Sequence, residues 1–578
     1  MFIDKEGIKN NSWQSFERLI CRLAQAEGFD GARVVGQSND HGADIIASRN
    51  GIRWLFQAKH WKKPVGVEVI DETLRAAQIY KAKVPVICAS NGFDTKAIQH
   101  QNELLKNGIN IQLWDVDTLI EHAKRLGEGV PNKYPIREYQ EKAIQGILNA
   151  YLNGSGKALA VLATGMGKTF IAAESIRRML NMNSELKVLV LAHTNPLIYQ
   201  LERSFWRFMT KEQKSLVWNG YEKPTTEELR DSNFVFACVD TIAEHIARYD
   251  EFPKFDVIIV DECHHAGSQT YRSVFRKTDA GKYNGPFLLG LTATPWRPDN
   301  VDLSDIFGET VVCIDMVEGL KKGFLANVDY RMYTDNINWD ALRNLEGQSF
   351  TPKQINRTLF IDQWDDSVVY ELKRTWLEQH NPRAIVFCGT IDHANIMTAK
   401  LNALGFCNAA AIYSNSGNGY SMTQFEKNRI LADFADGIVN VVCTVDIFNE
   451  GLDVPDVNIL VFQRVTHSRR IFIQQLGRGL RIAEDKDKVI VLDFVSDIRR
   501  FAAGIELKDG LEDDENYDKR KPTRISLPNK VTFKKVTGDD PETEKFLRVW
   551  LDDIAAIEAS GENTSVLKFP PIFENSKV

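Results

Sequence analysis

The sequence predicts an α/β protein of several domains, in which two doubly wound parallel-sheet domains follow a smaller α/β unit. Three observations predict this fold class. The chain of 578 residues is too long for a single hydrophobic core. Strand and helix patterns alternate along most of it, and the strand-like runs are continuously apolar, as is typical of strands covered on both faces. This alternating pattern occurs twice in succession, which indicates two domains of the same class.

The smaller unit is expected over residues 1–127. Apolar residues at helical spacing predict its helices, and Asn50-Gly51 predicts a tight hairpin between two of its strands. The expected helices span 15–26, 67–82 and 96–106, and the expected strands span 43–48, 52–59, 84–89 and 109–114. Turn-forming residues at 128–135 predict a linker after this unit.

The first parallel-sheet domain is expected over 136–328 and the second over 376–500, with an irregular connection at 329–375. The apolar runs of the first domain lie at 158–162, 188–191, 234–238, 257–260 and 287–290. Those of the second lie at 384–388, 409–413, 439–443, 459–462 and 489–492. After residue 500 the chain turns acidic, which predicts a solvated tail over 501–578 with one helical segment near 543–558.

Composition excludes several classes of protein. The eight cysteines are scattered and form no CxxC pair, so neither a disulfide framework nor a zinc site is expected. No apolar run is long enough to span a bilayer, and the first residues lack a secretory signal pattern, so we expect a cytoplasmic protein with no membrane partner. The net charge of −7 does not decide whether the chain binds nucleic acid, because phosphate affinity depends on local placement of charge.

A phosphate-binding loop is predicted at 163–169, between a predicted strand and a predicted helix. Its candidate nucleotide-binding residues are Thr164, Gly165, Met166, Gly167, Lys168 and Thr169. Glycines let backbone N–H groups face phosphate oxygens, and the helix start adds its positive end. Lys168 would reach the β- and γ-phosphates, and the Thr169 hydroxyl would bind Mg²⁺. Leu162 replaces the first glycine of the usual pattern.

Two adjacent carboxylates, Asp261 and Glu262, end the apolar run 257–260. Parallel sheets place their ligands at this end of the strands. Asp261 would hold Mg²⁺ and Glu262 would polarise the attacking water. Behind a phosphate loop, this pair predicts hydrolysis of a nucleoside triphosphate.

These residues resemble the superfamily 2 helicases and translocases over about 136–500, and are most similar to the motor subunits of type I and type III restriction enzymes. The resemblance implies two RecA-like domains, ATP and Mg²⁺ as cofactors, and Gln140 as the adenine contact. It also implies that Gly451 and Asp453, in the segment 444–453, help to bind the nucleotide. Arg478 and Arg481 would reach from the second domain to the γ-phosphate.

A second chemical group is predicted in the N-terminal unit, where Asp44 precedes Gln57-Ala58-Lys59 on a predicted hairpin. Residues two apart on a strand share a face, so Gln57 and Lys59 would lie together beside Asp44. Asp44 and the Gln57 amide oxygen would hold Mg²⁺, with Glu17 of the first helix completing the site, and Lys59 would supply a cation. The alternative is an ordinary hairpin with a surface lysine.

Residues 12–122 resemble the Mrr-type restriction endonuclease domain of the PD-(D/E)xK fold, in the version with glutamine in place of the second acid. The two resemblances together imply an ATP-driven DNA translocase joined to a Mg²⁺-dependent endonuclease, in restriction or defence against phage. They imply DNA, expected to be double-stranded, as the partner, with a further subunit or a second copy also possible. The alternatives are a repair or recombination helicase whose first domain only binds DNA, an RNA-directed ATPase, and a DNA-binding scaffold with an inert nuclease fold.

Overall fold

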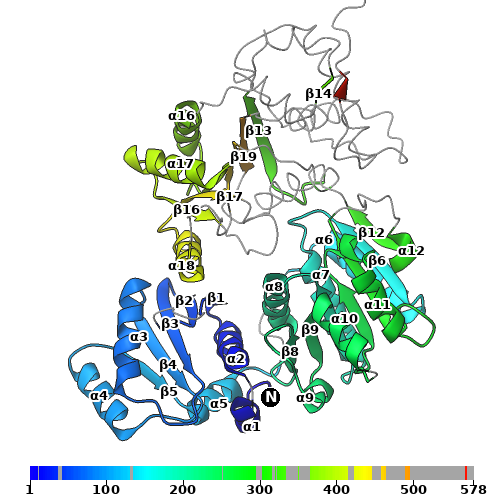
Figure 1. Ribbon diagram of the computed structural model, residues 1–578, viewed down its shortest axis with the longest axis horizontal. Helices are drawn as coiled ribbons and strands as arrows, with labels where there is room; N and C mark the ends of the chain where they lie inside the picture. Colours follow the sequence, from blue (N-terminus) through cyan, green and yellow to red (C-terminus); the bar gives the residue numbers. More distant parts are fainter. Residues whose placement is uncertain are drawn as a thin grey trace, which may run out of the picture.

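The computed structural model shows three α/β domains, and the predicted fold class is confirmed (Figure 1). The structure describes residues 1–10, 12–36, 42–129, 135–249, 251–293, 303–314, 319, 322–333, 349–350, 365–413, 422–445, 457–463, 488–494 and 567–568. The helical segment predicted near 543–558 lies outside these residues. No helix in the described ranges is both long enough and apolar enough to cross a membrane.

The N-terminal domain contains a five-stranded mixed sheet in the order β1-β2-β3-β4-β5. Its strands are β1 (Asp30–Val34), β2 (Ile45–Arg49), β3 (Ile52–Lys59), β4 (Val84–Ala89) and β5 (Gln112–Trp114). Its helices are α1 (Lys5–Asn10), α2 (Trp13–Ala26), α3 (Val67–Ile79), α4 (Thr95–Lys106) and α5 (Val116–Arg125). The predicted hairpin is confirmed, because β2 and β3 pair antiparallel and Asn50 and Gly51 both have positive φ.

Two helices cover opposite faces of this sheet. Apolar side chains of α2 pack with Ile45 and Phe56, whereas α3 packs with Ile46 and Leu55 through Ala76 and Tyr80. Neighbouring residues on a strand face opposite sides, so the two helices lie on different faces. Figure 1 shows α3 and α2 on either side of the strands.

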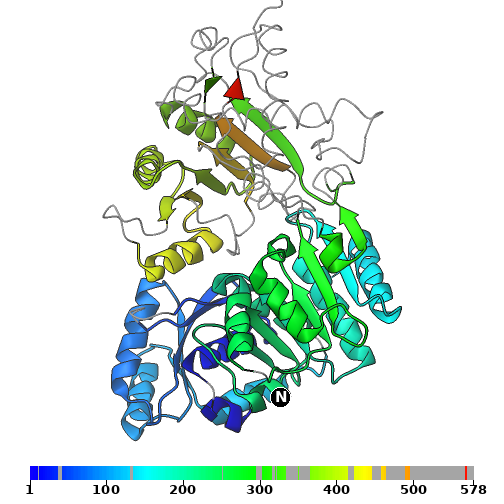
Figure 2. The same ribbon diagram turned by 45° about the vertical axis from the view of Figure 1, so that its right-hand side comes forward.

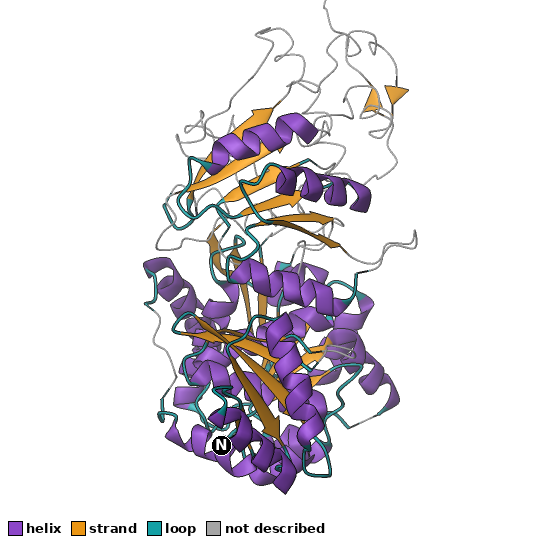
Figure 3. Ribbon diagram, turned by 90° about the vertical axis from the view of Figure 1, so that its left-hand side faces the viewer, coloured by secondary structure: helices purple, strands orange, loops and turns teal. Residues whose placement is uncertain are grey.

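The first parallel-sheet domain has seven parallel strands in the order β12-β6-β11-β10-β7-β9-β8. These are β6 (Lys157–Leu162), β7 (Val188–Ala192), β8 (Ser215–Trp218), β9 (Phe234–Cys238), β10 (Val257–Val260), β11 (Phe287–Thr292) and β12 (Thr310–Ile314). The helices are α6 (Glu138–Leu152), α7 (Lys168–Met182), α8 (Asn195–Phe205), α9 (Thr226–Asp231), α10 (Val239–Arg248), α11 (Gln269–Thr278) and α12 (Ser304–Phe307), with short 3₁₀ turns η1 (Trp206–Phe208) and η2 (Cys263–His265). Helices α6, α7 and α8 pack on one face of the strands, and α10 and α11 pack on the other. Figure 3 distinguishes the helices from the strands by colour.

The second parallel-sheet domain has six parallel strands in the order β13-β19-β18-β15-β17-β16. These are β13 (Asn327–Tyr333), β15 (Ala384–Phe387), β16 (Ala409–Tyr413), β17 (Val441–Val445), β18 (Ile459–Phe462) and β19 (Lys488–Phe494). The described helices are α16 (Asp365–Trp376), α17 (Ile391–Ala403) and α18 (Gln424–Ala435). Two short strands, β14 (Ser349–Phe350) and β20 (Leu567–Lys568), pair antiparallel in a separate sheet.

The expected connection at 329–375 is wrong at both ends, because β13 and α16 belong to the second domain. β13 pairs with β19 along its whole length, and α16 packs on the sheet through Leu372. The strand escaped prediction because it carries charge. Arg331 is buried, and its guanidinium is paired with Asp329 and Glu378.

The N-terminal domain is fastened to the first parallel-sheet domain by buried charge. Arg18 of α2 lies between two carboxylates, with Nε 2.8 Å from Glu202 Oε2 and Nη1 2.6 Å from Glu222 Oε1. These carboxylates, together with hydrogen bonds to Glu222, hold the pKa of the Arg18 guanidinium above its ordinary value despite its burial. Because all three side chains are nearly inaccessible to water, the pairing is much less screened than a surface ion pair.

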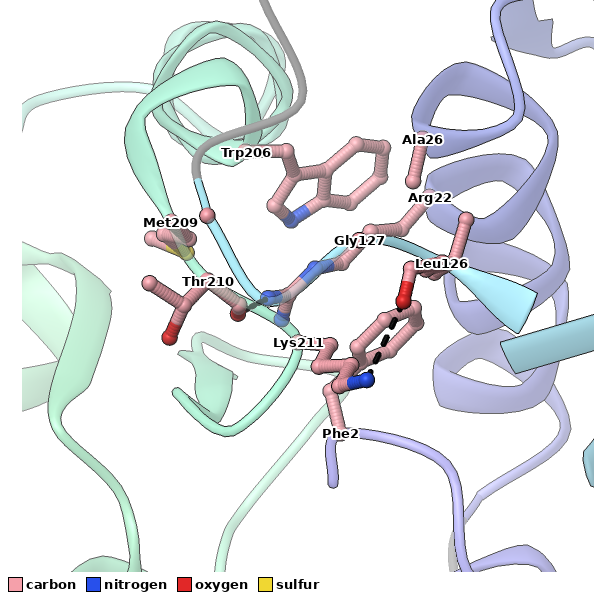
Figure 4. A pocket seen from close by; sticks show the side chains of 10 residues that line it. Phe2, Arg22, Ala26, Leu126, Gly127, Trp206, Met209, Thr210 and Lys211 are labelled. Atoms are coloured by element: carbon pink, nitrogen blue, oxygen red, sulfur yellow. Dashed lines mark hydrogen bonds between the residues drawn. The ribbon is translucent and has the colours of Figure 1, made fainter. Parts of the chain in front are cut away.

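Arg22, one turn further along α2, supports the same interface without a carboxylate. Its Nη2 donates to the carbonyl oxygens of Thr210 and Gln213, and its guanidinium lies 4.0 Å from the centre of the Phe2 ring. Figure 4 shows Arg22 reaching from α2 toward Thr210, beside the hydrogen bond that Lys211 donates to the Leu126 carbonyl. Burial lowers the pKa of Arg22.

The N-terminal domain also contacts the second parallel-sheet domain, through α18 (Figures 1 and 2). Arg53 of β3 is paired with Asp433, at 3.1 Å, and with Asp436. The Tyr80 ring meets Phe425 edge-on at 5.6 Å, and Ala432 packs into the apolar cluster over Leu55 and Ile46. The N-terminal domain therefore touches both parallel-sheet domains.

Removing the Arg18 guanidinium should loosen the first of these interfaces. Arg18→Ala leaves two buried carboxylates without their cation, so we expect a loss of about 3–5 kcal/mol in the free energy of unfolding. The measurement is chemical denaturation followed by tryptophan fluorescence.

The matched control is Arg125→Ala, which removes an arginine that is paired with Glu121 on the exposed face of α5. We expect no measurable change for this variant, because exposed ion pairs contribute little. Equal denaturation midpoints for Arg18→Ala and Arg125→Ala would contradict the role given to Arg18.

Candidate active sites

A glycine-rich loop joins β6 to α7, as predicted for residues 163–169. Gly165 and Gly167 have φ of 91° and 85°, a left-handed conformation that glycine adopts without strain. Lys168 is the first residue of α7, and its Nζ lies 3.4 Å from the carbonyl oxygen of Leu162, across the loop. The free N–H groups at the start of α7 and the Lys168 ammonium suit a phosphate group.

Gln140 packs beside this loop from the first turn of α6. Its Nε2 lies 3.5 Å from the Met166 carbonyl oxygen, and the hydroxyl of Tyr139 donates to the same oxygen at 3.0 Å. The Tyr139 ring stacks on Phe324, with centroids 4.4 Å apart. The structure thus brings Gln140 to the loop, while its contact with an adenine base stays a prediction.

Asp261 and Glu262 follow β10, which pairs in parallel with β7 and β11 at the centre of the sheet. Burial and the neighbouring Glu262 carboxylate raise the pKa of Asp261, and nearby Lys168 opposes this effect. The Asp261 Oδ1 atom is buried and has no hydrogen-bond donor among the described residues. Such an oxygen suits a hard divalent cation, so Mg²⁺ fits here, with the Thr169 hydroxyl as the other predicted ligand.

Glu262 has a left-handed backbone with φ of 48°, which is uncommon for a residue with a side chain. Its Oε2 lies 3.4 Å from Nδ1 of His264, and that ring nitrogen also lies 3.2 Å from the hydroxyl of Thr292 at the end of β11. The carboxylate pair and the end of the next strand are therefore linked through one buried imidazole.

Four predicted nucleotide-site residues lie outside the described residues. They are Arg478 and Arg481, which were predicted to reach the γ-phosphate, and Gly451 and Asp453. Their roles stay predictions.

The second predicted site assembles at the end of the β2–β3 hairpin. The Asp44 N–H donates to the Phe56 carbonyl at 3.0 Å, which places Asp44 across from Gln57, and the Ala58 N–H donates to Asp44 Oδ2 at 2.6 Å. Gln57 is fully buried, and Lys59 lies two residues further on the same face. The three residues that were predicted to act together therefore lie side by side.

Glu72 of α3 joins this group and was not predicted. Its Oε2 lies 3.5 Å from Lys59 Nζ, and a Cβ added at Gly42 would lie 2.9 Å from its Oε1 and 2.5 Å from Gln57 Nε2. Nothing in the helical pattern of 67–82 distinguishes Glu72 from its neighbours, because its position depends on how α3 packs across the sheet. The site therefore carries one more carboxylate than the sequence indicated.

Glu17 lies on α2, which covers the face of the sheet opposite α3. Glu17 is buried, and its part in the same site stays a prediction. Across the described ranges, no three histidine, cysteine, aspartate or glutamate side chains gather closely enough to hold a metal. A metal at this site would depend on the neutral Gln57 amide as well as on carboxylates.

Three protein families match successive segments of the chain. Residues 8–123 match a family described as restriction endonuclease, and residues 133–297 match the res subunit of type III restriction enzymes. Residues 366–483 match the helicase conserved C-terminal domain.

Known relatives are similar to parts of this chain. The chain is 27% identical over 465 residues to the type I restriction enzyme EcoAI endonuclease subunit of Escherichia coli, covering 74% of this chain and 55% of that one. It is 26% identical over 413 residues to a putative mitochondrial ATP-dependent helicase, irc3, of Schizosaccharomyces pombe, covering 70% and 64%. The chain thus spans between half and two thirds of the length of these relatives.

One solved structure supports the arrangement of the fold. It is the ATP-dependent type ISP restriction-modification enzyme LlaBIII bound to DNA, with a TM-score of 0.51 and 17% identity. The match covers 95% of this chain and 42% of that one.

Lys168→Ala should abolish ATP hydrolysis, because it removes the cation that faces the loop. We expect a loss of at least about a hundredfold in turnover, since the site would lack charge stabilisation of the transferred phosphoryl group. The measurement is phosphate release by the purified full chain.

Lys142→Ala is the matched control, because Lys142 is exposed on α6 and is paired with Glu138 one turn away. Hydrolysis by this variant should equal that of the wild type. Undiminished turnover in Lys168→Ala would show that the nucleotide is bound elsewhere.

Proposed function

We propose that this chain, a superfamily 2 helicase that carries an N-terminal Mrr-type restriction endonuclease domain, moves along DNA by ATP hydrolysis and cleaves it in a Mg²⁺-dependent reaction. The observation that carries the proposal is the pair of separate sites on one chain. One is the loop of Lys168 beside Asp261, and the other is the group of Asp44, Gln57 and Lys59.

At the first site, ATP would lie against the loop, with its β- and γ-phosphates near Lys168. Asp261 and Thr169 would hold Mg²⁺, which when bound neutralises charge on the phosphates. Glu262 would orient the attacking water. Arg478 and Arg481 would add positive charge from the second parallel-sheet domain.

At the second site, Asp44 and the Gln57 amide oxygen would hold a divalent metal, which when bound activates water and stabilises negative charge on the phosphodiester. Lys59 would place its ammonium near the attacking water or the leaving oxygen. Its pairing with Glu72 and its position 5.4 Å from the Trp61 ring limit the directions in which it can point.

Coupling of the two sites would come from the motor domains. A nucleotide held between the two parallel-sheet domains would close them, and hydrolysis would release them, so that each cycle advances the DNA. The N-terminal domain, fixed to the first parallel-sheet domain by Arg18, would move with that domain.

DNA is the proposed substrate, with restriction or defence against phage as the proposed role. Two relatives are named as restriction enzyme endonuclease subunits, and the similar solved structure is a restriction-modification enzyme bound to DNA. We further propose that a partner subunit or a second copy of this chain completes the recognition of DNA. Gel filtration with multi-angle light scattering, with and without DNA, tests the second copy.

Asp44→Asn should abolish DNA cleavage while leaving DNA-stimulated ATP hydrolysis within about twofold of the wild type, because Asp44 lies in a separate domain from the loop of Lys168. Plasmid nicking with Mg²⁺ and ATP, scored with phosphate release, measures both activities. A panel of modified and unmodified plasmids identifies the DNA that is attacked.

Asp30→Asn, on β1 of the same domain, is the control for the change of charge, because Asp30 is exposed away from Gln57. Cleavage that persists in Asp44→Asn would mean that the nuclease site is misplaced. Absence of cleavage by the wild type with either Mg²⁺ or Mn²⁺ on every plasmid would favour a domain that only binds DNA.

A further inference from the structure

The hydrogen bonds around the buried amide of Gln57 do not balance in the orientation that the structure records. Gln57 Oε1 accepts from the hydroxyl of Thr73, which lies on α3, while Gln57 Nε2 has no hydrogen-bond partner among the residues that the structure describes. The same hydroxyl also lies 2.7 Å from the carbonyl oxygen of Val69. A threonine hydroxyl has one proton, so it cannot donate to both oxygens.

Exchanging the amide oxygen and nitrogen of Gln57 gives both donors, the amide nitrogen and the Thr73 hydroxyl, one acceptor each. Nε2 then donates to the Thr73 hydroxyl oxygen, and the hydroxyl donates its single proton to Val69. The two ends of an amide have nearly the same size and shape, so the exchange requires no movement of neighbouring atoms. A buried donor without an acceptor is unfavourable, which favours this arrangement.

The exchange places Oε1 where Nε2 was recorded, beside Gly42 and Glu72. A Cβ at position 42 would come within 2.5 Å of that atom, so only glycine, here with φ of +88°, leaves the space beside it open. Asp44 lies across the hairpin from Gln57, and Glu72 approaches from α3. An amide oxygen facing two carboxylates is unfavourable by itself and becomes favourable when a cation lies between them.

We propose that Thr73 is a positioning residue for the nuclease site, and that its hydroxyl holds the Gln57 amide with the oxygen turned toward the divalent metal. This inference rests on the proposed nuclease function. A glutamate in place of Gln57 would need no such device, because its two oxygens are equivalent. Glutamine at this position requires a neighbour that accepts from its nitrogen, and Thr73 is that neighbour.

The test measures Mn²⁺ binding to the full chain without nucleotide, by electron paramagnetic resonance of the free ion. The binding that Asp44→Ala removes defines the contribution of the nuclease site. Thr73→Val should weaken that binding about tenfold, since residues that orient a metal ligand typically contribute 10–100-fold in affinity. Thr73→Ser, which keeps the hydroxyl, should restore it, and ATP hydrolysis should be unchanged in both variants.

A second background separates orientation from packing. In Gln57→Glu, the same Thr73→Val change should weaken Mn²⁺ binding by no more than about twofold, because a carboxylate has no wrong orientation. An equal loss in both backgrounds, or no loss in Thr73→Val alone, would overturn the inference. Should Thr73→Val fail to fold, Thr73→Ala removes the hydroxyl with a smaller change of shape.

The outcomes distinguish this inference from the function on which it rests. If Asp44→Ala binds Mn²⁺ as well as the wild type does, the proposed metal site is wrong, and so is the role of Thr73. If Mn²⁺ binding is lost in Asp44→Ala but unchanged in Thr73→Val, only the positioning role of Thr73 is wrong.

Discussion

The pairing of Arg18 with Glu202 and Glu222 fixes where the N-terminal domain lies relative to the ATP site. One guanidinium is enclosed with two carboxylates, and all three are almost completely removed from water. Such a group is strongly destabilising when any member is missing, so a docking geometry that separates them is disfavoured. Since α2 carries Arg18 and also packs beneath β2 and β3, the same contact orients the strands that carry Asp44 and Gln57.

Both candidate sites contain a buried polar group that the described part of the protein leaves unsatisfied. In the first it is the Asp261 oxygen, and in the second it is the Gln57 amide nitrogen as recorded. Buried polar groups are almost always paired, so each of these two exceptions calls for an explanation. A divalent cation would satisfy the Asp261 oxygen at the first site and, with the Gln57 amide exchanged so that its nitrogen donates to Thr73, the Gln57 oxygen at the second.

The sequence predicted the parallel sheets well because their strands are buried on both faces and therefore continuously apolar. The strands that it missed are those in which this rule fails. β13 carries the buried Arg331 and its partner Asp329, while β8 and β12 are edge strands with less apolar surface to signal them. The same reasoning found the loop of Lys168, because a strand–loop–helix motif is local in sequence.

Residues that join a site through tertiary packing could not be predicted from the sequence. Asp44 and Lys59 share a hairpin, so their proximity followed from strand geometry. Glu72 and Thr73 belong to a helix whose rotation over the sheet decides which side chains reach Gln57. The contacts of Arg53 with α18 join residues nearly four hundred positions apart, so no local sequence pattern predicts them.

Through the contact of Arg53 with α18, the N-terminal domain connects the two parallel-sheet domains, which would rotate relative to each other in a motor. Arg53 and Gln57 lie four residues apart on the same face of β3, while α8 and α18 belong to opposite halves of the motor. A rotation of those halves would have to break the contacts of Arg53, break the contacts of Arg18, or deform the N-terminal domain between them. The strand that carries Gln57 and Lys59 is therefore in direct contact with the second motor domain, while α2 of the same domain contacts the first.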